Sequence, residues 1–397
     1  MTTVPVNPKI LQWARESAGI TLLEAARKLH LHQTGEATPE KKLESLENGI
    51  EPPTRPLLLK MSQLYRRPLL TFYLEQPPKK GDRGEDFRRL PDEYAKTEEG
   101  LVDALVRDVT ARQEIVRAAL EDEDEAVPLT FVGSANMDQG INRVCQIIQS
   151  GIGFDLEKFR GYRKVSDAFA YLRGQVEAAG LFVLVIGDLG SHHSKISLEA
   201  FRGFALADPI APFVIINDQD SRAAWSFTLL HELTHVWLGK TGISGAVFDN
   251  GLERFCNDVA SILLLPAMDL DSLEVTDATK LELMIERINS FAEFRNISRS
   301  MVAYRLFRTN RINEDVWKKL KVEFRKQWLE LRAALRKKAQ EQEGGPTYYM
   351  VKRQRIGDAL IDLVARMMNS GTLTPTKAGK VLGVKPRNVY EMFQQAP

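Results

Sequence analysis

His231-Glu232-Leu233-Thr234-His235-Val236 is the stretch that decides the fold of this 397-residue chain. Its two histidines stand four positions apart, so on a helix both imidazoles project from one face, about one turn from each other. Both can then reach a single metal ion, and the glutamate after the first histidine points beside that ion. The chain holds only six histidines, so this spacing rarely arises by chance. A purely structural pair of histidines on a helix face is the alternative.

The residues before the histidines indicate that their helix is buried. Pro212 to Asn217 is a short run of β-branched and aromatic residues that opens with proline, as is typical of a buried strand. A polar loop then leads into Ala223 to Leu230, whose apolar residues predict a helix that packs into a core. We therefore expect the two histidines to line a cleft and not an open surface. Zinc needs at least one further protein ligand and usually leaves a fourth position for water.

Glu253 is the best candidate for the third metal ligand. It begins an apolar-rich segment that predicts a helix and ends at Pro266. Asn257 follows one helical turn later, where its side chain can hydrogen-bond a metal ligand. The alternative for Glu253 is an exposed carboxylate that suits the positive end of the helix dipole. Weaker candidates for the same ligand position are Cys256, Asp249 and Asp258.

The histidine pair and the helix after it resemble the ImmA/IrrE family of metallopeptidases. His231 to His235 matches the HELxH of that family, and Glu253 to Pro266 matches its segment E-x-x-A-N-x-F-A-x-x-L-L-M-P. The departures from this pattern all keep apolar or small residues: Cys256 for alanine, Val259 for phenylalanine and Leu265 for methionine. Phe201 to Phe204 upstream and Ile297 to Leu306 downstream also resemble the family. The likeness covers residues 165–312.

The resemblance implies a zinc endopeptidase. The residues that would hold Zn²⁺ are His231, His235 and Glu253, with Asn257 as the hydrogen-bond partner of a ligand. Glu232 would act as the general base and then pass the proton to the leaving amine. The oxyanion needs a further donor, and the sequence offers His192-His193 and Tyr348-Tyr349 as candidates. The alternatives are polar loop residues for the histidines and packing aromatics for the tyrosines.

Residues 1–76 predict a separate, all-helical module. Four short helices are expected, at Pro8 to Gly19, Thr21 to Leu29, Thr38 to Gly49 and Leu57 to Tyr65. Their order resembles the XRE (Cro/repressor-type) helix-turn-helix domain. The residues that carry this likeness are Ala14-Arg15-Glu16, Ala25-Ala26 and Glu47-Asn48-Gly49 with Pro53-Thr54.

The third of these helices is the candidate recognition helix of the module. Lys41, Lys42 and Ser45 would then face DNA, although Glu40 and Glu44 on the same helix oppose phosphate binding. The loop before it, residues 31–37, is longer than the tight turn of the XRE family. A helical module used for protein contact is the alternative.

The rest of the chain completes an α+β fold that is predominantly helical. Residues 77–164 predict a connector and a helical region, residues 165–312 a zincin-like peptidase domain with a small sheet, and residues 313–397 a helical C-terminal region. Trp317, Phe324 and Trp328 recur at helical spacing there and predict a packing stripe. Two capped helices around Gly383 resemble a second helix-turn-helix, and this segment is basic. DNA contact, substrate contact and packing are all open for it.

Composition favours a cytoplasmic protein that does not enter a membrane. The chain is 44% hydrophobic and 27% charged with a net charge of +1, so any binding of nucleic acid must be local. Its two cysteines argue against a disulfide scaffold. We recognise no signal peptide and no apolar stretch long enough to span a membrane.

Two functions remain open from the sequence. The leading prediction is a site-specific zinc endopeptidase that binds DNA through residues 1–76. By family resemblance, its substrate is a regulatory protein, of the repressor or antitoxin type, in a mobile-element, stress-response or toxin–antitoxin circuit. The alternative is a DNA-binding transcriptional regulator or antitoxin whose metal site is structural or sensory. Metal-dependent cleavage of a co-encoded repressor would separate the two, and a homodimer is compatible with either.

Overall fold

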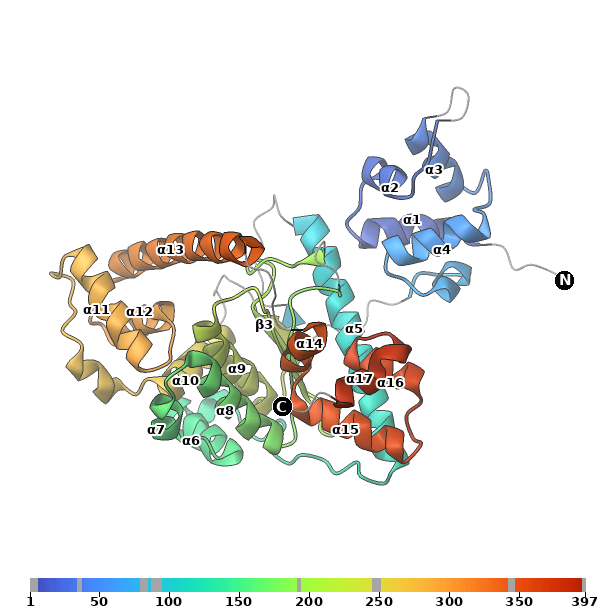
Figure 1. Ribbon diagram of the computed structural model, residues 1–397. Coiled ribbons are helices and arrows are strands. Elements are labelled where there is room, and N and C mark those ends of the chain that lie inside the picture. The colour runs from blue at the N-terminus through green and yellow to red at the C-terminus, as the bar shows by residue number, and fades with distance from the viewer. Residues whose placement is uncertain are drawn as a thin grey trace. The chain divides into compact units, whose positions relative to one another are not determined.

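The computed structural model describes residues 6–33, 38–78, 85–86, 95–190, 194–244, 251–341 and 347–394. These residues are predominantly helical and form one small sheet, so the predicted α+β class is confirmed (Figure 1). The chain divides into two compact units. Residues 1–83, 89–109 and 188–200 form the first unit, and residues 84–88, 110–187 and 201–397 form the second.

Short capped helices build the N-terminal part of the first unit. They are α1 (Pro8–Ser17), α2 (Leu22–Lys28), α3 (Pro39–Glu47), α4 (Arg55–Leu64) and the 3-10 helix η1 (Leu69–Tyr73). Each of the four α-helices starts after an Asn or Thr whose side chain accepts a hydrogen bond from the first turn. Leu11, Leu43 and Met61 lie in their common core. The four helices that the sequence predicts here are therefore present.

A buried ion pair joins α1 to α3. Arg15 donates through Nε and Nη2 to the two carboxylate oxygens of Glu47, at 2.7 and 2.8 Å. It also donates to the backbone carbonyl of Ile20 at 3.1 Å. The hydrogen bonds to Glu47 raise the pKa of Arg15 above its ordinary value. A two-pronged pair of this kind fixes the relative orientation of two helices.

The sheet of the second unit has five strands in the order β1-β5-β3-β4-β2. They are β1 (Glu85–Asp86), β2 (Phe182–Val185), β3 (Gly203–Leu206), β4 (Phe213–Ile216) and β5 (Gly242–Ser244). Strand β3 is antiparallel to both of its neighbours, whereas β2 is parallel to β4 and β1 to β5. Every residue of β2, β3 and β4 is buried. Strand β4 lies within the apolar run Pro212 to Asn217 that predicts a strand, whereas β1 and β5 are too short to show such a run.

Helix α9 (Arg222–Trp237) packs on β3 and β4 and forms the centre of this unit. From Trp225 onward almost all of its residues are buried, so the helix is enclosed by the rest of the unit and carries apolar residues on more than one face. Helix α10 (Gly251–Leu264) lies along it (Figure 1). Other helices of the chain are α5 (Ala95–Asp122), α6 (Ile141–Ile152), α7 (Leu156–Gly161), α8 (Val165–Ala178), α11 (Leu281–Phe294) and α12 (Arg299–Arg308). Two 3-10 helices, η2 (Met137–Gln139) and η4 (Ala267–Ser272), accompany them.

The C-terminal region is helical, as predicted. Helix α13 (Glu314–Glu341) packs through Phe324, which is 2% exposed, and through Trp317, whose ring stacks on Phe307 at 4.7 Å. Helix α14 (Tyr348–Ile356) contacts β2. The last helices, α15 (Asp358–Asn369), α16 (Pro375–Leu382), η5 (Pro386–Asn388) and α17 (Val389–Gln394), pack together (Figure 1). Among the described residues, no helix is long and apolar enough to cross a membrane.

Candidate metal centre

Helix α9 presents two buried imidazoles to the same point. His231 and His235 are 3% and 0% exposed, and their Nε2 atoms lie 3.2 Å apart. Leu229, Leu230 and Leu233 on the same helix belong to the hydrophobic core, which sinks the histidines below the surface. The four-residue spacing therefore places both imidazoles on the same face of the helix, as helical periodicity predicts.

Glu253 brings a carboxylate to these imidazoles from the neighbouring helix α10. Its Oε2 lies 3.3 Å from Nε2 of His231, and its Oε1 lies 3.0 Å from Nε2 of His235. The side chain is only 1% exposed. These three residues, which we call the metal group, are the cluster of metal-ligating side chains found among the described residues. They come from two helices that pack against each other.

The spacing of the metal group fits a zinc ion. A tetrahedral zinc with bonds of about 2.0–2.1 Å holds its ligand atoms about 3.3 Å apart. The three separations measured here are 3.2, 3.3 and 3.0 Å. Neither oxygen of Glu253 accepts a hydrogen bond of good geometry, although both are buried. A buried carboxylate without hydrogen bonds is costly, and a divalent cation between the three residues would remove that cost.

Asn257 fixes the orientation of the first imidazole. It lies one turn after Glu253 on α10, and its Oδ1 is 3.1 Å from Nδ1 of His231. Because an amide oxygen only accepts, Nδ1 carries the proton and donates it to Asn257. The lone pair of His231 is then on Nε2, which faces the other two members of the metal group. This is the contact that the sequence predicts for Asn257.

The charges in the metal group stabilise one another. Burial alone would raise the pKa of Glu253, but the adjacent imidazoles have the larger, opposite effect, and together they lower this pKa to about 2. Burial lowers the pKa of His231, but the carboxylates of Glu253 and Glu232 raise it above the ordinary value. Cys256 behaves differently, because burial and the same two carboxylates raise the pKa of its thiol well above the ordinary value. Cys256 is therefore a buried neutral thiol and lies outside the metal group.

Glu232 belongs to α9, and its fully buried side chain lies against strand β3. A Cβ built on Gly203 of β3 would come within 2.7 Å of Glu232 Oε1, 2.7 Å of Thr228 Cγ2 and 2.9 Å of the Ile215 carbonyl oxygen. The missing side chain of Gly203 thus makes the space in which this carboxylate sits. We did not predict this role for Gly203, although a glycine inside a buried strand often marks a close approach.

The other candidate ligands have different surroundings. Asp258 accepts hydrogen bonds from Tyr304 Oη at 2.7 Å and from Arg308 Nε at 2.8 Å. Burial and this carboxylate raise the pKa of Tyr304, which keeps its hydroxyl protonated as a donor. This network packs α12 against α10, and Asp258 is not a member of the metal group. Asp249 lies outside the described residues.

The structure describes one of the two candidate pairs of oxyanion donors. His192 and His193 lie outside the described residues. Tyr348 and Tyr349 stand at the start of α14, where their rings meet edge to face at 5.3 Å and Tyr348 is 58% exposed. Their role in catalysis stays a prediction.

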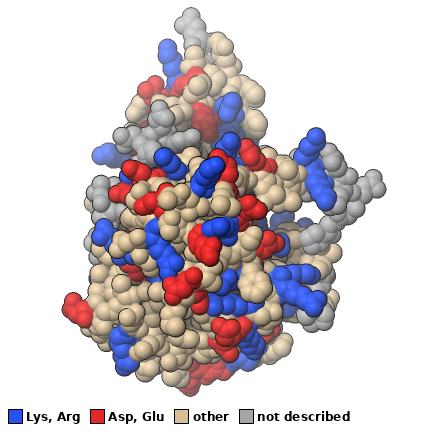
Figure 2. Space-filling model, turned by 90° about the vertical axis from the view of Figure 1, so that its left-hand side faces the viewer, with Lys and Arg blue, Asp and Glu red and all other residues tan. Residues whose placement is uncertain are grey.

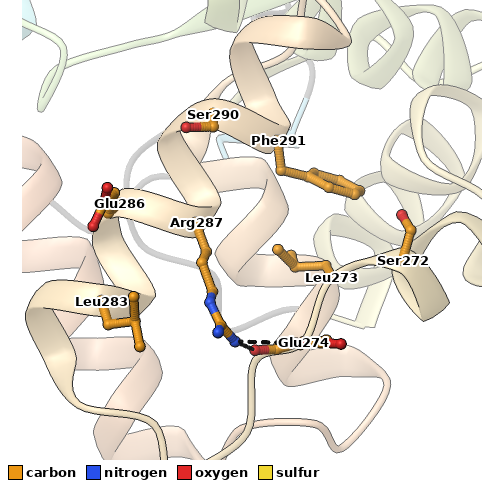
Figure 3. Close-up of a pocket in the computed structure, with 8 residues that line it drawn as sticks. All are labelled: Ser272, Leu273, Glu274, Leu283, Glu286, Arg287, Ser290 and Phe291. Carbon is orange, nitrogen blue, oxygen red and sulfur yellow. Dashed lines mark hydrogen bonds and ion pairs between the residues drawn. The ribbon is translucent and has the colours of Figure 1, made fainter.

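A shallow pocket lies apart from the metal group. It is lined by residues of α11, by the last residue of η4 and by the two residues that follow η4: Ser272, Leu273, Glu274, Leu283, Glu286, Arg287, Ser290 and Phe291 (Figure 3). Arg287 reaches across it and donates to the backbone carbonyl of Glu274. None of these residues belongs to the metal group, so this pocket does not mark the candidate site.

The residues predicted to face DNA lie on α3. Lys41 is exposed, whereas Lys42 and Ser45 are half-buried, and the acidic Glu44 is exposed beside them. On the face of the molecule that Figure 2 shows, Lys and Arg lie among Asp and Glu without a large area of one sign. A broad positive field is therefore missing from that face.

Comparison with known proteins agrees with the geometry of the metal group. Residues 188–307 match the peptidase family described as the IrrE N-terminal-like domain. This range contains α9 and α10 and thus all three members of the metal group. It supports the predicted relation to the ImmA/IrrE family and a metallopeptidase-type function for this part of the chain. No curated protein and no solved structure gives a significant match to the chain.

Proposed function

We propose that this chain is a zinc-dependent, site-specific endopeptidase. The observation that carries the proposal is the convergence of His231, His235 and Glu253, at separations of 3.0–3.3 Å, inside the domain that matches a peptidase family. Glu232 stands between the two histidines in sequence and is fully buried beside them. Two nitrogen ligands, one carboxylate and a second, separate carboxylate are the parts that metal-assisted hydrolysis needs.

Each residue has a distinct task in this proposal. His231, His235 and Glu253 would hold the metal, and Asn257 keeps His231 in the tautomer that leaves Nε2 unprotonated. When bound there, zinc supplies a positive charge that polarises the peptide carbonyl and acidifies water. Glu232 takes a proton from the attacking water and delivers it to the departing amine.

The substrate that we propose is a regulatory protein of the repressor or antitoxin type. The match to the IrrE N-terminal-like domain supports this class, because the ImmA/IrrE resemblance implies a regulatory and not a digestive role. The circuit would belong to a mobile element, a stress response or a toxin–antitoxin locus. DNA would be bound through α3, with Lys41, Lys42 and Ser45 toward the duplex. The resemblance of residues 1–76 to XRE domains supports this second role.

A regulator with a structural or sensory metal site is the competing function. The observation that favours it is burial: His231, Glu232, His235 and Glu253 are all 3% exposed or less. A metal held only for stability needs no access for a peptide, whereas a catalytic metal keeps one position open. The two functions differ in whether Glu232 is needed for any reaction.

The test uses the full-length protein loaded with zinc and the proteome of its own cell. We expect new protein N-termini that appear with the wild type and disappear with chelator or with Glu232→Gln. A general base contributes about 10²- to 10⁴-fold, so the variant should be nearly inactive while its zinc content stays near one ion per chain. The matched control is Glu274→Gln, which changes a side chain that is 85% exposed. New N-termini that form equally with Glu232→Gln would refute the proposed mechanism. Bound zinc without any new N-termini would favour the regulator.

A further inference from the structure

We propose that α15, α16 and α17 form a second DNA-binding module, in which the helical segment from Pro386 to Gln394 reads double-stranded DNA. This inference stands apart from the peptidase function, because it rests on residues outside the matched domain. It also differs from DNA binding through α3, because it uses a different helix at the other end of the chain.

The turn between α16 and the next helical segment has the geometry of a helix-turn-helix. Helix α16 starts after Thr374, whose hydroxyl accepts from the backbone N–H of Lys377. It ends at Gly383, which has a left-handed backbone with φ of 62°. A Cβ on Gly379 would come within 2.9 Å of the Val384 carbonyl oxygen and 3.2 Å of the Pro386 nitrogen. The glycine therefore lets the turn fold back closely onto α16, as a tight three-residue connection between two helices requires.

The inner side of the module is a complete small core. Ala378, Leu382, Val389 and Met392 are all 0% exposed. The module belongs to the second unit, in which Arg112 donates to the Val381 carbonyl at 3.3 Å and Arg353 donates to the Met392 carbonyl at 2.6 Å. A rigid, well-packed helix pair of this kind can present its outer residues in a fixed arrangement.

The outer side of the module carries positive charge and few apolar side chains. Lys377, Lys385 and Arg387 are exposed, and within the described residues neither Lys385 nor Arg387 forms an ion pair through its side chain. Residues 358–394, which make up the module, contain five Lys and Arg and three Asp and Glu. Such a local excess of positive charge attracts the phosphates of DNA, which the chain as a whole, at +1, does not.

The chemistry of the leading turn suits base recognition. Arg387 is exposed and Asn388 is half-buried at the start of the second helical segment. In a helix-turn-helix, the first residues of the second helix contact base edges in the major groove. Arginine pairs with two acceptors of guanine, and asparagine pairs with adenine in the same way. Lys385, just before them, is placed to contact a phosphate.

A protein partner fits this face less well. Protein interfaces are anchored by large apolar or aromatic side chains that pack into a dry centre. Within residues 358–394, all of which the structure describes, Tyr390 is the exposed large hydrophobic residue, at 56%. A single aromatic among lysines and arginine matches a nucleic-acid surface better than the centre of a protein interface.

The test measures the binding of full-length protein to fluorescent duplexes of about 30 base pairs, drawn first from a random library and then from selected sequences. The background is Lys41→Ala/Lys42→Ala, which removes the two lysine contacts proposed for α3. In this background we expect duplex binding at low salt that weakens as salt rises. Adding Lys385→Ala and Arg387→Ala should weaken binding roughly tenfold or more. It should also reduce the slope of log affinity against log salt concentration by about one for each lost phosphate contact. Arg387→Ala should also relax the base preference at one position.

The control for the loss of one positive charge is Arg366→Ala on α15, an exposed residue that pairs with Glu125. It should leave duplex binding within twofold of its background. All variants except Lys42→Ala change exposed residues, and Lys42 is half-buried, so unchanged melting temperatures should show that each protein is folded. The proposal is wrong if the background protein does not bind duplex DNA at low salt, or if Lys385→Ala and Arg387→Ala bind as the background does. It is also wrong if Arg366→Ala loses as much, or if the variants alter protein cleavage and leave DNA binding intact.

Discussion

Gly203→Ala is the substitution that best tests whether the Glu232 side chain packs against strand β3. The new methyl group would lie 2.7 Å from Glu232 Oε1 and from Thr228 Cγ2, and 2.9 Å from the Ile215 carbonyl oxygen. Ordinary contact begins at 3.4 Å, so the carboxylate or the strand must move by about 0.7 Å. The Ile215 oxygen is a backbone atom of the paired strand β4 and cannot turn away. The displacement therefore falls mainly on Glu232 and on α9.

The size of the effect follows from this crowding. Overpacking of a buried site by one methyl group costs about 1–3 kcal/mol of unfolding free energy. A misplacement approaching 1 Å at a catalytic group lowers the rate by up to about 10²-fold. The three atoms nearest to the methyl group all lie outside the metal group, so zinc content should stay at the wild-type level.

Three measurements check the Gly203→Ala prediction. They are the urea midpoint, the zinc content and the cleavage rate of a substrate found through its new N-terminus. The matched control is Gly174→Ala in α8, where a Cβ meets nothing within 4 Å. Adding Thr228→Ser to Gly203→Ala removes one of the three close contacts and should restore part of the stability. A Gly203→Ala protein with the stability and the cleavage rate of the wild type would show that Glu232 does not sit against this strand.

Four further predictions concern other contacts. Asn257→Ala should weaken zinc binding by about 10- to 100-fold, because the ring of His231 loses its orienting partner, whereas Asn257→Asp should keep most of the affinity; competition with a chelator measures both. Burial alone would lower the pKa of His231, but the carboxylate of Glu253 raises it above the ordinary value of about 6.5. Protons therefore compete with the metal for His231 already above that pH. We expect zinc affinity to fall as the pH is lowered, with the fall beginning above about pH 6.5. In the metal-free protein, protonated His231 should stabilise the fold at low pH, and this stabilisation should be lost as the pH rises through its raised pKa. Ionised Glu253 should also stabilise the fold, and this contribution should disappear only as the pH falls toward about 2. Free energies of unfolding measured over a range of pH would contradict this if they showed the opposite trends. Glu47→Ala should destabilise the first unit by about 3–5 kcal/mol, because Arg15 is left buried without its partner, and Arg15→Met with Glu47→Leu should recover most of that loss in urea unfolding.

Local sequence patterns predicted the elements whose cause is local. The strands at residues 182–185, 203–206 and 213–216 appear as short apolar runs, and the helices begin at residues whose side chains cap them. The spacing of His231 and His235 predicts their common face because helical geometry alone decides it. Glu253 was reached through its place on the next apolar helix, and the structure brings it to 3.0 Å from His235.

Contacts between distant segments could not be predicted in the same way. The approach of Gly203 to Glu232 depends on how closely α9 packs on β3, and no spacing within one segment encodes it. The hydrogen bonds of Asp258 to Tyr304 and Arg308 join residues about fifty positions apart. Strands β1 and β5 are two and three residues long, so neither shows an alternating pattern. Tertiary packing determines all of these features.

The origin of the metal group on two helices has a consequence for the lifetime of the protein. His235 belongs to α9 and Glu253 to α10, so a bound ion would act as a cross-link that closes the chain between them. Unfolding would then require release of the ion, and stability would rise with the logarithm of the free metal concentration. Zinc supply would control how long the folded protein persists as well as whether it can cleave. A fall in zinc would turn the protein off first by loss of the ion and then by proteolysis of the loosened helices.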